Sequence, residues 1–134
     1  MKALHKMDNL DRGHLLCTLF PDQLINIQDC VKNECNYFLE NETELRGAWM
    51  KTGFFTADFW YFLVKNAYKK IEIENGKLRK KNRSFSDFLF DGHQSIFTIH
   101  CLINYSNSNN CDEKLRLAIH LFFGKDSILK VINN

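Results

Sequence analysis

The sequence predicts an all-α protein in which residues 1–134 form one domain, a bundle of about five or six helices around a single core. Helix-capping signals recur ahead of apolar residues spaced at the helical period, at Asn41, Thr56, Ser84 and Asp112. No stretch alternates apolar and polar residues over more than a few positions, so no sheet is expected. With one Pro and six Gly in 134 residues, there is no room for a long breaker-rich linker.

The first helix is expected to run from about Asp8 or Asp11 to Phe20. Pro21 suits the first turn of a second helix, where the N–H group that proline lacks has no intrahelical partner. The apolar residues of this second helix fall on one face: Leu24, Ile27, Val31, Cys35 and Phe38.

Asn41, with Glu44 three residues later, fits a capping box and predicts a short third helix that ends near Gly53. Thr56 is expected to cap a fourth helix, which begins in a dense aromatic run and stops at Gly76. Its apolar stripe consists of Trp60, Leu63, Val64, Ala67, Tyr68 and Ile71.

Ser84, with Asp87 three residues later, fits a second capping box and predicts the longest and most central helix, over residues 84–105. Its core residues are expected to include Phe88, Ile96 and Ile99. Residues 106–110 are Ser and Asn only and predict a loop. Asp112 then caps a further helix that ends before Gly124.

Several functional classes are disfavoured by composition. The formal net charge of +2 is too small to indicate a nucleic-acid or membrane partner by itself. The first residues lack the apolar core of a signal peptide, and no stretch is apolar enough to span a bilayer, so we expect a cytoplasmic protein that does not enter membranes. The five cysteines have neither disulfide nor zinc spacing, which predicts buried reduced thiols and no cofactor.

Large aromatic residues crowd the start of the fourth helix in greater number than one helix face can bury. Some of them are therefore expected to form an exposed apolar patch that binds a protein partner or a second copy of the chain. The leading interpretation is a non-enzymatic accessory or protein–protein interaction module. Its candidate surface consists of Phe54, Phe55, Phe59, Tyr61 and Phe62.

A basic connector at residues 77–83 supports a second interpretation, a nucleic-acid-associated protein. Clustered Lys and Arg side chains can contact phosphates. The aromatic residues that usually accompany such charges in single-strand binding are absent here, so a solvated loop is favoured. The candidate phosphate contacts are Lys77, Arg79, Lys80, Lys81 and Arg83.

A third and weaker interpretation is an enzyme with an interhelical polar pocket near Asp91, His93 and His100. The two histidines are two helical turns apart, and a Cys–His centre would need a partner from another helix. Histidines at the edge of the core are the favoured explanation. The sequence contains none of the common nucleotide-binding or hydrolase motifs.

Four short motifs resemble those of short uncharacterised bacterial proteins found on conjugative or other mobile elements. These motifs are Leu15–Pro21, Phe59-Trp60, Phe90-Asp91-Gly92 and Phe97–Leu102. The resemblance covers nearly the whole chain, but its motifs are packing motifs. It implies an all-helical fold and an accessory role, and it assigns no catalytic residue.

Replacing Lys80, Lys81 and Arg83 with Ala tests the basic connector. If the connector is a solvated loop, the wild type binds nucleic acid only weakly at physiological salt, and the free energy of unfolding changes by less than about 0.5 kcal/mol. Sub-micromolar binding that the triple substitution abolishes would contradict this expectation. A plot of the logarithm of such an affinity against the logarithm of the salt concentration should have a slope of about −0.9 for each duplex phosphate that is neutralised.

Overall fold

The computed structural model describes residues 3–45, 57–74 and 83–124, and every regular element in these ranges is a helix. The all-α prediction is confirmed. The elements are the 3₁₀ turns η1 (Leu4–Lys6) and η2 (Pro21–Gln23) and the helices α1 (Asn9–Leu19), α2 (Leu24–Glu40), α4 (Ala57–Glu74), α5 (Arg83–Phe90), α6 (Gln94–Ser106) and α7 (Glu113–Phe122).

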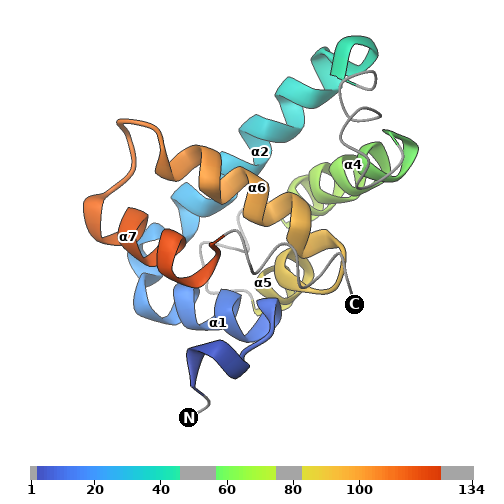
Figure 1. The fold of residues 1–134 in the computed structure, drawn as a ribbon. Coiled ribbons are helices and arrows are strands. Elements are labelled where there is room, and N and C mark those ends of the chain that lie inside the picture. The colour runs from blue at the N-terminus through green and yellow to red at the C-terminus, as the bar shows by residue number, and fades with distance from the viewer. Residues whose placement is uncertain (1–2, 46–56, 75–82, 125–134) are drawn as a thin grey trace.

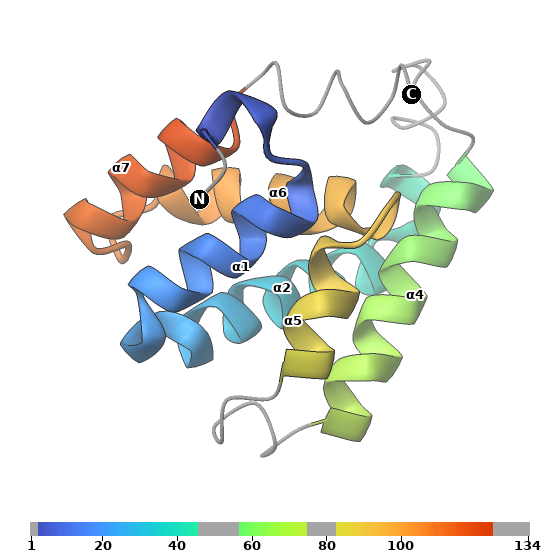
Figure 2. The same cartoon turned by 90° about the horizontal axis from the view of Figure 1, so that it is seen from below.

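Helix α6 is the centre of the bundle (Figure 1). It crosses α2 and also packs against α4, α5 and α7. Helix α1 packs against α5 and α7, and seen from below α5 lies between α1 and α4 (Figure 2). The described residues therefore surround one continuous core to which α1, α2, α4, α5, α6 and α7 all contribute.

The N-terminal half follows its capping signals. The Asp8 carboxylate accepts a hydrogen bond from the Asp11 N–H at 2.8 Å and so caps α1. Pro21 begins the turn η2, which leads directly into α2. The predicted face of α2 is buried at Ile27, Val31, Cys35 and Phe38.

Helices α2 and α4 pack in an antiparallel arrangement. The rings of Phe38 and Trp60 meet edge to face at 6.4 Å, and one turn further along the Cys35 thiol donates to the Val64 carbonyl oxygen at 3.6 Å. The stripe predicted for α4 is confirmed, with Leu63, Val64, Ala67 and Ile71 buried and Trp60 and Tyr68 half-buried.

The prediction of one long helix over residues 84–105 is wrong. The chain forms α5 and α6, separated at Gly92, whose φ of +49° lies in the left-handed region that favours glycine. The Thr98 hydroxyl donates to the Leu89 carbonyl oxygen at 2.6 Å, so a side chain of α6 binds the end of α5. This break changes which residues face the core. Ile96 and Ile99 are buried as predicted, whereas Phe88 is only half-buried.

The other capping predictions have mixed outcomes. The Asp112 carboxylate accepts from the N–H groups of Lys114 and Leu115, as expected. Asn41, predicted to cap the third helix, is the C-cap of α2, and its side-chain amide donates to the Tyr37 carbonyl oxygen at 2.8 Å. A helical turn follows at residues 42–45. Helix α5 begins at Arg83, so Ser84 lies within it. Thr56 and the expected helix end at Gly53 lie outside the described residues.

A glycine permits the close approach of α1 and α5. Gly13 lies directly against the ring of Phe90, and a Cβ atom at residue 13 would stand only 2.1 Å from Phe90 Cγ. Phe90 is fully buried and stacks on Phe123, with ring centroids 5.6 Å apart. Because the ring is held from both sides, it cannot move away from a larger residue at position 13.

We therefore expect Gly13→Ala to lower the free energy of unfolding by about 2 kcal/mol or more, even though Ala is favoured over Gly inside a helix by about 1 kcal/mol. Urea unfolding followed by circular dichroism measures the change. Gly124→Ala is the matched control, because the nearest atom to its new Cβ would be the His120 carbonyl oxygen at 3.4 Å, an ordinary contact. Equal unfolding midpoints for the two variants would contradict the packing argument.

Candidate functional site

The aromatic patch, defined here as Phe59, Phe62 and His93, is the part of the predicted interaction surface that the structure brings together. Phe59 and Phe62 are three residues apart on α4, so they lie on one side of the helix, and their rings stack at 6.3 Å. Phe59 also meets the His93 ring edge to face at 5.4 Å. Phe62 is 57% exposed, whereas Phe59 is half-buried against the core.

The remaining members of the predicted surface are placed differently or not described. Tyr61 is half-buried, and the Lys65 ammonium lies 5.1 Å from the centroid of its ring, a cation–π contact on the surface of α4. Phe54 and Phe55 lie outside the described residues. The aromatic patch is thus smaller than the predicted surface, and it gains His93 from the junction between α5 and α6.

The three residues of the predicted polar pocket do not come together. Asp91 and His93 line a pocket of about 350 Å³, beside Asp8 and Asn9 at the start of α1. His100 lies two turns further along α6, where its ring packs against Phe38 and Trp60 at 5.7 Å from each.

The pocket at Asp91 and His93 lacks the geometry of a nucleophilic centre. Its Ser95 hydroxyl donates to the Gly92 carbonyl oxygen at 2.5 Å, which directs the proton to the backbone. The Ser95 hydroxyl oxygen also accepts a hydrogen bond from the Asn9 side-chain amide at 3.3 Å. An activated serine would instead donate to a general base. Both contacts are those of a residue that joins α1 to the start of α6.

Little of the basic connector can be placed. Lys77, Arg79, Lys80 and Lys81 lie outside the described residues. Arg83 begins α5, but its side chain is likewise not described. Phosphate binding by this segment stays a prediction.

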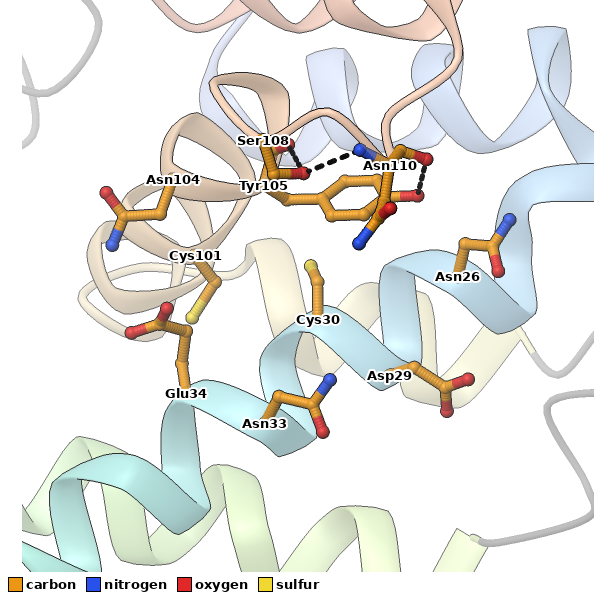
Figure 3. Close-up of a pocket in the computed structure, with 10 residues that line it drawn as sticks. All are labelled: Asn26, Asp29, Cys30, Asn33, Glu34, Cys101, Asn104, Tyr105, Ser108 and Asn110. Carbon is orange, nitrogen blue, oxygen red and sulfur yellow. Dashed lines mark hydrogen bonds between the residues drawn. The ribbon is translucent and has the colours of Figure 1, made fainter.

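A polar groove between α2 and the C-terminal half of α6 was not predicted from the sequence (Figure 3). It has a volume of about 420 Å³. Its lining comes from two helices and the loop after α6: Asn26, Asp29, Cys30, Asn33, Glu34, Cys101, Asn104, Tyr105, Ser108 and Asn110. The asparagine and serine residues of this lining belong to no catalytic motif that could be recognised in the sequence. Their convergence is visible only in the fold.

Glu34 is the most desolvated carboxylate of the groove. Its side chain is 25% exposed, and burial raises the pKa of its carboxyl group, an effect opposed by a hydrogen bond from Asn104. Its Oε2 lies 3.9 Å from His100 Nε2. Burial lowers the pKa of His100, so this neighbour is poorly suited to carry a compensating positive charge.

Three cysteines are buried where α2, α4 and α6 meet: Cys30, Cys35 and Cys101. Burial raises the pKa of each of these thiols, to about 12 for Cys35. Cys17 and Cys111 are half-buried. Within the described ranges, no group of three or more His, Cys, Asp or Glu side chains is arranged to hold a metal ion.

No protein-family model, curated protein or solved structure matches this chain. Among the helices of residues 3–45, 57–74 and 83–124, none combines the length and the apolar character needed to cross a bilayer.

The thiol environments predict a sharp division in chemical reactivity. In the folded protein near neutral pH, a disulfide reagent should modify Cys17 and Cys111 first, because only the thiolate reacts and the buried thiols are neither ionised nor accessible. Peptide mapping by mass spectrometry identifies the modified residues, and all five cysteines should react in denaturant. Rapid modification of Cys35 or Cys101 without unfolding would contradict the buried arrangement.

Proposed function

We propose that this protein is a non-enzymatic interaction module that binds a protein partner through the aromatic patch on α4. The observation that carries the proposal is the exposure of Phe62, a large apolar ring that is 57% accessible and stacked on Phe59. An exposed aromatic ring stacked on a second ring supplies apolar contact area of the kind that concentrates binding energy in protein interfaces.

The surroundings of Phe62 favour binding at low entropic cost. Its neighbour Phe59 is held by contacts with the core and with His93, so the pair has little freedom to lose when a partner covers it. Lys65 and Asp58 are exposed charged residues on the same helix and would lie at the rim. An apolar centre with a polar rim is the usual anatomy of an interface.

Site-specific photo-crosslinking tests this function. A benzophenone amino acid is placed at Phe62 in the full chain, expressed in the cells from which the protein comes. Leu117 is the matched control, because it is also apolar and 59% exposed but lies on α7, away from α4 (Figure 1). We expect a discrete crosslinked product from position 62 and none from position 117. A product of twice the chain mass identifies the partner as a second copy.

A substitution then measures the energetic contribution of the patch. We expect Phe62→Ala to weaken binding of the crosslinked partner by at least about tenfold, a loss of about 1.4 kcal/mol. The free energy of unfolding should change by less than about 1 kcal/mol, because the ring is largely exposed. The same crosslinks from positions 62 and 117, or none from position 62, would contradict the proposed function.

A further inference from the structure

The groove between α2 and α6 has an unbalanced charge. Two carboxylates line it, those of Asp29 and Glu34, and none of its ten lining residues is Lys or Arg. Lys32, the basic residue between them on α2, pairs with Glu72 of α4 at 3.7 Å. The groove is therefore a local site of negative potential in a chain whose formal net charge is +2.

Glu34 is the more buried of the two carboxylates. Its carboxylate is partly withdrawn from water, and its neighbours are the Asn104 amide and the His100 ring. An amide donor compensates only part of the cost of desolvating a negative charge. No Lys or Arg of the described residues forms an ion pair with Glu34, so a cation entering the groove would supply the missing charge.

The two carboxylates occupy opposite ends of the groove (Figure 3). Asp29 and Glu34 are five residues apart on α2, which corresponds to about 7.5 Å along the helix axis and about 140° around it, so their side chains line opposite edges of the groove. Between them lie the Cys30 thiol and the ring of Tyr105, the less polar part of the lining. An aromatic ring of this kind attracts a nearby ammonium group as well as its methylene stem.

We propose that the groove binds an aliphatic diamine or polyamine. One ammonium group pairs with Glu34 and a second with Asp29, and the methylene chain lies over Cys30 and Tyr105. The amide oxygens of Asn33 and Asn104 accept hydrogen bonds from the remaining N–H groups. This arrangement pairs both carboxylates and two of the asparagine side chains of the groove with complementary features of one ligand class.

The composition of the lining disfavours other ligand classes. A phosphate or a nucleic acid would meet two carboxylates and no cation. A divalent metal ion requires several converging oxygen ligands, and the described residues contain no cluster of three or more side chains that could hold one. In a polyamine, by contrast, the positive charges are separated by methylene groups, and the two carboxylates of the groove are likewise separated.

Isothermal titration calorimetry of the full chain with putrescine and with spermidine tests the proposal. We expect saturable binding of one ligand per chain. The isosteric substitution Glu34→Gln should weaken binding by at least about tenfold, because it removes a charge while keeping the side-chain volume. Asp29→Asn, at an exposed position where folding is not at risk, should also weaken binding. Glu40→Gln is the matched control on α2, outside the groove, and should leave the affinity unchanged.

Two further ligands separate a specific site from general counterion attraction. Butylamine, which has a single ammonium group, should bind at least about tenfold more weakly than putrescine, because it can satisfy only one carboxylate. Mg²⁺ should produce no saturable heat. The proposal is overturned if putrescine does not saturate, if Glu40→Gln weakens binding as much as Glu34→Gln does, or if Mg²⁺ binds as well as putrescine.

Discussion

The buried guanidinium of Arg12 makes the contacts on which the packing of η1 and α7 against α1 depends. Arg12 is 7% exposed and donates to the carbonyl oxygens of Phe122 at 2.8 Å and Leu4 at 3.0 Å. A buried charge is costly unless its donors are satisfied, so the acceptors must come close to α1. One acceptor lies at the end of α7, where the helix dipole favours a cation, and the other lies in the turn η1. Arg12 thereby joins segments separated by 110 residues.

Helical periodicity predicted which residues α2 and α4 bury, because a period of 3.6 determines the inward face once a helix is continuous. Continuity itself could not be inferred between Ser84 and Tyr105. The apolar spacing is compatible with one helix across Gly92. It is equally compatible with two shorter amphipathic helices, because each of them keeps the helical period. A positive φ at one glycine is a property of the folded chain, stabilised here by the bond from Thr98 to Leu89. Local capping signals carry no information about such tertiary contacts.

The candidate residues could be foreseen only in part. The aromatic run was predicted to leave some of its rings exposed because it exceeds what one face can bury, and Phe62 is exposed in the fold. Asp91, His93 and His100 looked like neighbours on one helix, but His93 at the N-cap of α6 contacts Phe59, whereas His100, two turns further along the same helix, packs on Phe38. His100 is accordingly a histidine at the edge of the core, the explanation that the sequence favoured. The groove escaped prediction because convergence of residues from α2, α6 and the following loop depends on how the helices cross.

Helix α6 connects the two proposed sites and keeps them at a fixed separation. His93, at its N-cap, belongs to the aromatic patch, and Tyr105, near its C-terminus, belongs to the groove. These residues are twelve positions apart, about 18 Å along a helix. Most of α6 between them is buried, including Ile99 and Leu102 with no exposed surface, so the helix cannot shift without disturbing the core. Coupling between distant sites requires an element with two alternative arrangements. A helix that is buried along most of its length provides a rigid spacer, and binding at either site is therefore expected to leave the affinity of the other unchanged.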